Sequence, residues 1–219
     1  MPAPDIHAVI WDFGGVISSS PFEAFAAYER AHGLPANFLR TVNATNHLDN
    51  AWARFERSDI DLATFDAEFA AESTALGHGV RGKDVIALLG GSIRPQMVQA
   101  LRVLRPRLKI GLITNNVASP GAGSADPNPD PVGRDAVLPL FHHVIESAKL
   151  GLRKPDPQIY LLMCEALAVA PAHCVFLDDL GVNLKPARTL GMHTIKVDDP
   201  DVALAQLQAL VGFPLDADA

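Results

Sequence analysis

The chain has 219 residues, of which 48% are hydrophobic and 20% are charged, and its formal net charge at pH 7 is −7. This composition is typical of a packed globular protein and excludes a disordered or fibrous chain. Because nucleic acids and anionic membranes bind clustered Lys and Arg, the negative charge argues against both as partners. The first apolar run is too short for a signal peptide, and no stretch reaches the roughly 20 apolar residues of a membrane span, so we expect a soluble cytoplasmic protein.

The first predicted element is a short strand at residues 9–11, which ends at Asp12. An apolar run of this length, rich in β-branched and aromatic residues, is typical of a buried strand in a parallel sheet. Residues 175–177 form a second run of this kind and end at Asp178 and Asp179. In open α/β sheets the ligand binds beyond the carboxyl ends of the strands, so we expect these acidic side chains to converge on a divalent cation and an oxyanion.

Residues 18–93 show helical patterns instead of a second strand. The expected helices begin at a capping box in residues 20–23, and further helices are expected around residues 62–69 and at residues 85–89. An inserted helical module beside a strand-end site would serve as a lid that excludes water and selects substrate. We therefore expect a helical cap domain over residues 18–93 and a core domain formed by residues 1–17 and 94–219.

From residue 94 onward, helices and strands alternate. The predicted helices are residues 95–104, 157–167, 183–190 and 202–211, and the predicted strands are residues 109–113, 143–146, 175–178 and 194–197. Repeated alternation predicts an α/β fold with a doubly wound parallel sheet. Residues 117–135 are rich in Pro and Gly, and we expect a flexible surface loop there or, alternatively, a mobile flap beside Thr114.

The predicted strand ends carry side chains that suit phosphoryl chemistry. Asp12 can attack a phosphorus atom if a cation offsets the repulsion between the two anions. Aspartate before two glycines is also common in ordinary turns, so this residue alone decides little. Thr114 and Asn115 offer a hydroxyl and an amide to phosphoryl oxygens, or else form a strand-end turn with an N-cap.

Asp178 and Asp179 form the strongest local signal for a metal ion. Adjacent carboxylates after an apolar strand repel each other, and a hard cation with oxygen ligands would compensate for that repulsion. A purely structural acidic turn is the alternative. Asn183 follows at a distance that lets it either cap the next helix or orient a carboxylate.

Lys154 supplies a compact positive charge that suits a phosphoryl group or a carboxylate nucleophile. Exposed lysines are common in loops, and Lys149 is a competing candidate. The neighbouring Arg153 is expected to face solvent. The histidines show no metal-ligand spacing and receive no role, and Cys164 and Cys174 are expected to be buried, reduced thiols.

The order and spacing of these motifs together are highly specific. The chain resembles the haloacid dehalogenase-like hydrolase superfamily, and within it the branch that holds the N-terminal phosphatase domain of soluble epoxide hydrolases. The resemblance is carried by residues 12–16, 112–115, 145–160 and 176–188. It covers essentially the whole chain and implies a Rossmann-like core with an inserted cap domain, which in this superfamily usually sets substrate preference.

The resemblance also implies a role for each residue at a matching position. Asp12 would be the nucleophile that forms an aspartyl-phosphate, and Lys154 would balance charge between Asp12 and the phosphoryl group. Thr114 and Asn115 would bind the transferring phosphoryl group of a small phosphorylated substrate. The implied ligands of a Mg²⁺ cofactor are Asp12, the carbonyl oxygen of Gly14, and Asp179, with Asp178 beside them.

Gly14 departs from the family pattern, because phosphatases of this superfamily usually carry a second aspartate here as general acid and base. The backbone carbonyl can still bind a metal, but proton delivery to the leaving group is lost. A positioned acid–base group is worth roughly 10²–10⁴ in rate, or about 3–5 kcal/mol of barrier. We therefore expect a preference for leaving groups that depart without protonation, such as those of acyl phosphates or sugar-1-phosphates.

Three functions are compatible with these residues. The favoured one is a Mg²⁺-dependent phosphatase that hydrolyses a small phosphorylated metabolite through an aspartyl-phosphate. The alternative that Gly14 supports is a catalytically weak or inactive binding protein of the same superfamily. The third is a 2-haloacid dehalogenase, but that branch works without a metal, so the paired Asp178 and Asp179 argue against it.

Overall fold

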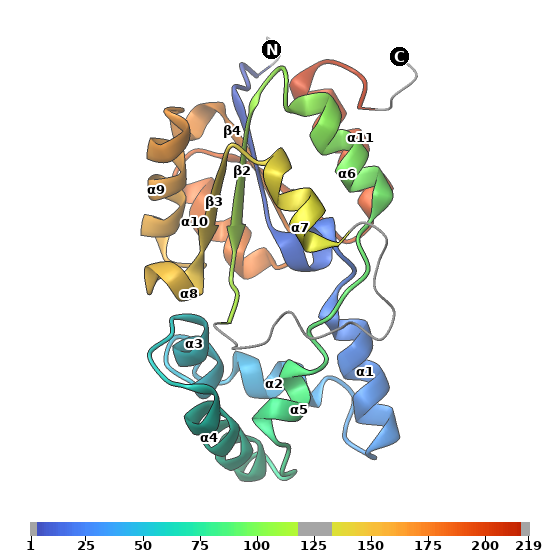
Figure 1. The fold of residues 1–219 in the computed structure, drawn as a ribbon, viewed down its shortest axis with the longest axis vertical. Coiled ribbons are helices and arrows are strands. Elements are labelled where there is room, and N and C mark those ends of the chain that lie inside the picture. Colours follow the sequence, from blue (N-terminus) through green and yellow to red (C-terminus); the bar gives the residue numbers. More distant parts are fainter. Residues whose placement is uncertain (1–3, 118–132, 216–219) are drawn as a thin grey trace.

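The computed structural model describes residues 4–117 and 133–215, and within them five parallel strands form one sheet. The strand order is β3-β2-β1-β4-β5, so β1 lies at the centre (Figure 1). The strands are β1 (Ala8–Trp11), β2 (Lys109–Thr114), β3 (His143–Glu146), β4 (Cys174–Asp178) and β5 (His193–Lys196). Because the order runs outward in both directions from β1, the predicted doubly wound parallel sheet is confirmed.

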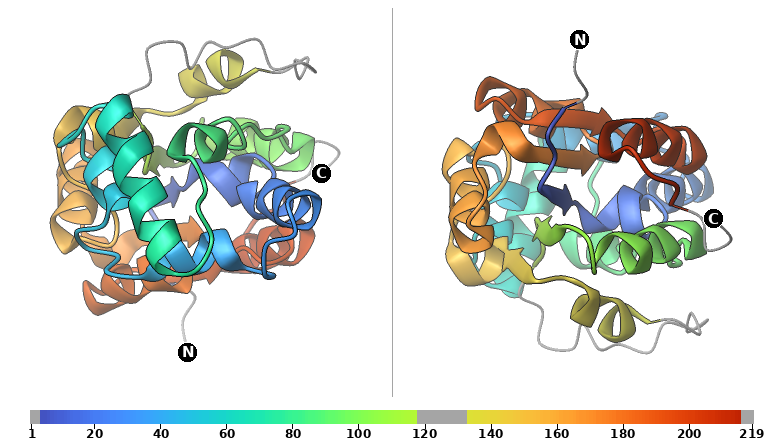
Figure 2. Two further views of the ribbon diagram at one scale, coloured as in Figure 1. Left: turned by 90° about the horizontal axis from the view of Figure 1, so that it is seen from below. Right: turned by 90° about the horizontal axis from the view of Figure 1, so that it is seen from above.

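Helices cover both faces of this sheet (Figure 1 and Figure 2). One face carries α6 (Pro95–Leu104) and α11 (Pro200–Val211), and the other carries α9 (Pro157–Leu167) and α10 (Gly181–Thr189). The side chains of β1 alternate between the two layers: Val9 and Trp11 pack with α6 and α11, whereas Ala8 and Ile10 pack with α9 and α10. The central strand is therefore buried on both faces, which explains its continuous apolar sequence.

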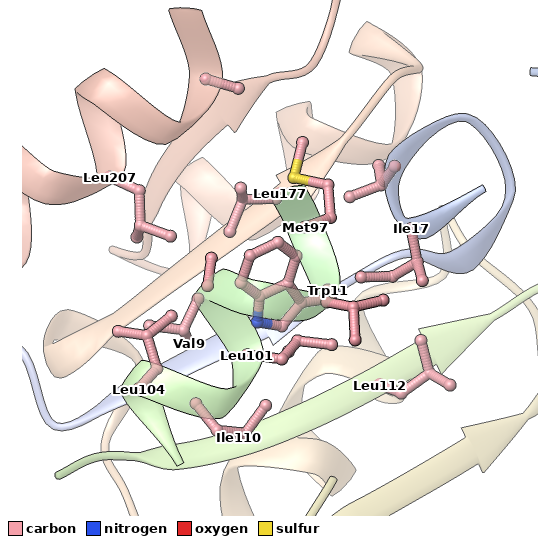
Figure 3. Packing of buried hydrophobic residues seen from close by; sticks show 14 of the residues in the cluster. Val9, Trp11, Ile17, Met97, Leu101, Leu104, Ile110, Leu112, Leu177 and Leu207 are labelled. Atoms are coloured by element: carbon pink, nitrogen blue, oxygen red, sulfur yellow. The ribbon is translucent and has the colours of Figure 1, made fainter. Parts of the chain in front are cut away.

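Trp11 is the last residue of β1 and is fully buried. Figure 3 shows its indole ring among side chains of α6 and β4, including Met97, Leu101 and Leu177. The backbone amide of Asp12 then donates to the carbonyl oxygen of Leu177 at 2.9 Å. Asp12 is thus held at the end of a strand that is fixed by packing on both sides.

The helices within residues 21–86 form a helical module beyond the carboxyl ends of the strands (Figure 1). Its helices are α1 (Pro21–Ala31), α2 (Phe38–Ala44), α3 (Ala51–Glu56), α4 (Leu62–Ala75) and α5 (Gly82–Ile86). The module has its own apolar cluster, to which Phe25, Phe38, Phe65, Phe69 and Val85 contribute. Figure 2 shows the module in front of the sheet when the molecule is viewed from below.

The module differs from the sequence-based expectation in three places. The short helices α2 and α3 were not predicted. The helix expected at residues 85–89 begins three residues earlier and ends at Ile86. The hydroxyl of Ser20 accepts from the amide of Phe22 at 3.4 Å, not from that of Glu23 as a capping box requires.

The remaining helices differ less from their predicted ranges. α10 begins at Gly181 and not at Asn183, and α11 begins at Pro200 because Asp199 accepts from two amides as its N-cap. Two short helices, α7 (Arg134–Val137) and α8 (Ser147–Leu150), were not predicted, and α7 begins within the predicted Pro-rich loop. Residues 118–132 of that loop, and with them the predicted flap, lie outside the described residues.

Cys164 and Cys174 are both free and buried, as predicted. The fold brings their Sγ atoms to 3.8 Å, although one lies on α9 and the other opens β4. No helix in residues 4–117 or 133–215 is long and apolar enough to cross a membrane.

Candidate functional site

Asp12 stands where β1 ends, and two donors hold its carboxylate. The backbone amide of Phe13 donates to its Oδ1 at 2.7 Å, and the ammonium group of Lys154 lies 2.8 Å from the same atom. The side chain of Asp12 is 11% exposed. A carboxylate in this position is fixed in orientation and still reachable from outside.

Lys154 lies in the loop between α8 and α9 and is almost completely buried. Its side chain is 1% exposed, and its Nζ lies 2.8 Å from Asp12 Oδ1 and 2.7 Å from Asp178 Oδ2. The competing candidate, Lys149, is 78% exposed and pairs with Glu146. Of the two lysines considered from the sequence, only Lys154 reaches the strand ends.

Asp178, the last residue of β4, is fully buried and has donors on both carboxylate oxygens. Its Oδ1 accepts from the amide of Leu180 at 2.8 Å and from Asn183 Nδ2 at 3.0 Å, while its Oδ2 accepts from Lys154. Asn183 lies inside α10, so it orients a carboxylate and does not cap the helix. Asp178 therefore holds the ammonium group of Lys154 in place. The expectation that Asp178 lies beside a metal ion stays a prediction.

Asp179 follows at the same strand end and packs against the turn after Asp12. Gly15 in this turn has a φ of +78°, and a Cβ atom added to it would lie 2.3 Å from Asp179 Oδ2. Glycine is required here both for the left-handed backbone and for the close approach of this carboxylate. Arg94 donates from Nη1 to the carbonyl oxygen of Gly15 at 2.9 Å, which ties α6 to the same turn.

Thr114 and Asn115 stand at the end of β2. Because Trp11 pairs with Leu112 in the parallel register, these residues lie beside the turn that follows Asp12. The carboxamide of Asn115 brackets the backbone of Lys154: its Oδ1 accepts from the Lys154 amide at 2.9 Å, and its Nδ2 donates to the Lys154 carbonyl at 3.0 Å. Asn115 therefore holds Lys154 in place, and its predicted contact with a phosphoryl group stays a prediction.

The pKa values of the site show an excess of negative charge. Burial raises the pKa of Asp12 to about 8 in spite of Lys154, and the charges of Asp178 and Asp179 add to the rise. Burial and the charge of Asp178 raise the pKa of Asp179 to about 6. Burial lowers the pKa of Lys154, but the charges of Asp12 and Asp178 outweigh it, so the net shift is upward. One ammonium group thus faces three carboxyl groups.

The donor set fits a hard divalent cation. Asp12, Asp178 and Asp179 each offer a carboxylate oxygen, and these atoms lie within 4.8 Å of one another. Ligand oxygens on opposite sides of a Mg²⁺ ion lie about 4 Å apart, and carboxylate and carbonyl oxygens are the ligands that this ion prefers. A bound cation would also relieve the repulsion that raises the two pKa values.

Asp5, His7 and His173 form a second group, with ligand atoms within 4.8 Å of one another at the opposite end of the sheet. The two imidazole rings are stacked, with centroids 4.6 Å apart and an interplanar angle of 10°. Nitrogen lone pairs lie in the ring planes, so parallel rings do not direct them at one point. The carbonyl oxygen of Asp5 instead accepts from His173 Nδ1 at 2.6 Å. We assign no metal to this group.

Arg153 does not face solvent, contrary to the expectation. Its side chain is 16% exposed, and its Nε lies 2.6 Å from Glu56 Oε2 on α3. The expectation failed because the partner lies 97 residues away in the sequence. The contact of Arg94 with Gly15 was also not predicted. A positive charge at the N-terminus of a helix is opposed by the helix dipole, so an arginine at this position indicates a contact with another part of the molecule.

Comparison with known proteins identifies the family. The sequence model described as haloacid dehalogenase-like hydrolase matches residues 6–191. Acyl-CoA dehydrogenase family member 10 of Mus musculus is 34% identical over 95% of this chain, and bifunctional epoxide hydrolase 2 of Sus scrofa is 33% identical over 96% of it. The chain spans only 19% and 40% of these two relatives, respectively. The resemblance to soluble epoxide hydrolases noted in the sequence is confirmed.

Two further similarities cover most of both chains. A protein named as a phosphatase from Mycobacterium tuberculosis is 30% identical over 88% of this chain and 88% of its own length. A haloacid dehalogenase-family enzyme of Bacteroides thetaiotaomicron, solved with magnesium and inorganic phosphate, superimposes with a TM-score of 0.56 at 20% identity. That match covers 87% of this chain and 93% of the other, and it establishes a common fold.

Proposed function

The chain belongs to the haloacid dehalogenase-like hydrolase family, and we propose that it is a Mg²⁺-dependent phosphatase that acts on a small phosphorylated metabolite. The observation that carries the proposal is the convergence of Lys154 with Asp12, Asp178 and Asp179 at the strand ends. This arrangement supplies a nucleophile, a fixed positive charge and oxygen ligands for a hard cation. The similarity to a named phosphatase and to an enzyme solved with magnesium and phosphate supports it.

Asp12 is the proposed nucleophile, because its carboxylate is held in one orientation by Phe13 and Lys154. An oxygen of Asp12 forms a bond to phosphorus, and the leaving-group oxygen takes the electron pair of the P–O bond that breaks. Water then attacks the phosphorus of the aspartyl-phosphate, the bond to Asp12 breaks, and phosphate is released.

The other site residues hold charge and orientation during these steps. Lys154 balances the negative charge of Asp12 and the phosphoryl group, and Thr114 and Asn115 are proposed to bind phosphoryl oxygens. When bound, Mg²⁺ supplies the positive charge that offsets the repulsion between the carboxylate and the phosphoryl group. Its proposed ligands are Asp12, the carbonyl oxygen of Gly14, and Asp179, with Asp178 beside them.

Gly14 narrows the substrate class. The charged side chains that act on Asp12 in the described residues are Lys154, Asp178 and Asp179, and each already has a role in holding charge. Because Gly14 has no side chain that could protonate a leaving group, we infer a preference for acyl phosphates or sugar-1-phosphates over alkyl phosphates.

The helical module is proposed to act as the cap domain of this site. It lies beyond the carboxyl ends of the strands, where the acidic side chains converge (Figure 1). We propose residues 18–93 as the cap and residues 1–17 and 94–219 as the core. A module in this place excludes water from the reaction and selects the organic part of the substrate.

Phosphate release with and without Mg²⁺, for the wild type and for Asp12→Asn, tests the proposal. The panel pairs p-nitrophenyl phosphate and acetyl phosphate with alkyl phosphates. Turnover should require both Mg²⁺ and Asp12 and should fall steeply as the leaving group worsens. A thermal melt of Asp12→Asn checks that a loss of turnover does not come from unfolding.

Two outcomes would contradict the proposal. No phosphate release from any substrate would favour the binding protein that the loss of the acid at Gly14 suggests. Metal-independent release of halide from a 2-haloacid would instead identify a dehalogenase.

A further inference from the structure

The helical module contacts the sheet domain through a buried ion pair. Glu56 ends α3 of the module, and Arg153 lies in the loop between α8 and α9 of the sheet domain. Arg153 Nε donates to Glu56 Oε2 at 2.6 Å, and the side chains are only 16% and 8% exposed. Ser58 in the module also donates to the carbonyl oxygen of Ala148 in α8 at 2.8 Å.

Each charged group of this pair has a second partner. The Oε1 atom of Glu56 accepts from Trp52 Nε1 at 2.8 Å, and Arg153 Nη1 donates to the carbonyl oxygen of His47 at 2.9 Å. Both partners belong to the module, so the side-chain bonds of Arg153 within the described residues run to that side. An ion pair that is largely shielded from water and has these further partners is sensitive to the loss of either charge.

Arg153 is joined by one peptide bond to Lys154. Arg153 reaches toward the module, whereas Lys154 reaches Asp12 and Asp178 at the strand ends. The carboxamide of Asn115 brackets the backbone amide and the backbone carbonyl of Lys154. A displacement of the module that moved Arg153 would therefore reach the backbone of Lys154, which carries the ammonium group, through a single peptide unit.

The module is attached to the sheet domain at a second place, where the chain enters and leaves it. Ser18 and Ile93 form an antiparallel bridge, and the amide of Ser19 donates to the carbonyl oxygen of Ser92 at 2.8 Å. In Figure 1 these connections run on the side of α1 and α5, while α3 lies beneath α8. The ion pair thus secures the side of the module away from its chain connections.

We propose that Glu56 and Arg153 are positioning residues that couple the seating of the helical module to the placement of Lys154 Nζ. They reach the reaction centre only through Lys154. The effect on rate rests on the proposed phosphatase function, whereas the coupling between the module and the Lys154 loop does not.

Glu56→Gln tests the effect on rate, because it removes the charge and keeps an acceptor for Trp52. We expect kcat/KM for acetyl phosphate to fall by about tenfold to a hundredfold, with kcat falling more than KM rises, since a small misplacement of a reacting charge can cost about 10² in rate. The matched control is Glu68→Gln, which breaks the Arg54–Glu68 pair (2.8 Å) between α3 and α4 inside the module. It should stay within about twofold of the wild type.

A double-mutant cycle with Arg153→Gln tests whether the two residues act as one unit. If they do, the double variant should lose about as much activity as either single variant. Losses that multiply would show independent roles and would overturn the proposal, as would equal effects of Glu56→Gln and Glu68→Gln.

Hydrogen exchange of the peptides that cover residues 149–157 tests the coupling without turnover. Glu56→Gln should speed exchange of the Lys154 amide, which is bonded to Asn115, and Glu68→Gln should not. Unchanged protection in Glu56→Gln would overturn the coupling. If the wild type releases no phosphate, the proposed function fails, and this exchange measurement alone decides the coupling.

Discussion

The carboxyl groups at the strand ends and the carboxyl group of Asp66 in the helical module have opposite environments. Asp66 on α4 accepts from Arg81 Nε at 3.1 Å and from the amide of Lys83 at 3.0 Å. These hydrogen bonds, chiefly that of Arg81, hold the pKa of Asp66 below its ordinary value. At the strand ends, burial raises the pKa of Asp12 to about 8 and that of Asp179 to about 6.

Charge balance explains the difference. Asp66 has a guanidinium group of its own, so its ionised form stabilises the fold. At the strand ends Asp12, Asp178 and Asp179 share the single ammonium group of Lys154. Unfavourable ionisation of this kind is typical of groups arranged for binding and catalysis, because a ligand completes the charge balance.

Lys154→Met has the largest expected effect, because it removes the ammonium group that is paired with both Asp12 and Asp178. Losing one partner of a buried ion pair costs about 3–5 kcal/mol of unfolding free energy. Phosphate release should fall by at least about 10³-fold, since the charge that is proposed to stabilise the transferring group is gone. Activity assays and urea denaturation measure the two effects.

Arg153→Met is the matched control for this variant, because it makes the same substitution one residue earlier. It should retain more activity than Lys154→Met, since it acts only through the position of its neighbour. Equal losses in the two variants would mean that the site depends on the loop as a whole and not on the ammonium group.

Gly14→Asp would sharpen the comparison by adding a further carboxyl group to the site. Gly14 has a φ of −67°, and a Cβ atom added to it would meet nothing within 4 Å, so the backbone accepts a side chain there. The rate for alkyl phosphates should rise by about 10²–10⁴-fold, the usual worth of a general acid, and that for acetyl phosphate much less. Gly14→Ala should not raise the rate for either substrate. Equal rate increases of Gly14→Asp for alkyl phosphates and for acetyl phosphate would exclude an acid role for the new carboxyl group.

Asp66→Asn has the smallest expected effect and tests the carboxyl group whose charge is balanced by Arg81. A carboxyl group with a lowered pKa contributes stability that is complete above its ordinary pKa of 3.8 and is lost as the pH falls through the lower, folded value. The variant should melt a few degrees below the wild type at pH 7, and the difference should shrink in strong acid. The control is Asp59→Asn in the exposed pair with Arg57, where little change is expected. A constant difference at all pH values would contradict this account.

The sheet and the convergence of its acidic residues could be predicted because their signals are local. Each strand is a continuous apolar run, and a parallel sheet necessarily places the residues after β1 and β4 side by side. The helices α2 and α3 have only 7 and 6 residues, too few for an apolar periodicity to show. Their positions are set by packing against the aromatic cluster of the module.

The bond between Glu56 and Arg153 could not be predicted for a different reason. Nothing local distinguishes Arg153 from an exposed loop arginine, and the partner is selected only when the module folds over the strand ends. The two hydrogen bonds between Asn115 and the backbone of Lys154 could not be predicted either. They depend on the conformation of the loop that holds Lys154 and not on the spacing of the residues in the sequence. Sequence patterns thus located the candidate side chains at the strand ends, while the contacts that hold them required the three-dimensional structure.

The hydrogen bond from Trp52 to Glu56 also gives the protein a built-in optical probe. The chain contains two tryptophans, and the other, Trp11, is fully buried in the sheet domain. The emission of Trp11 is therefore a constant background, whereas the Trp52 indole is bonded to Glu56, the residue of α3 that pairs with Arg153. Separation of the module from the sheet domain would remove Arg153 from Glu56 and let water reach the indole beside it. The Trp52 emission should then shift to the red, so stopped-flow fluorescence can time this motion without an added dye.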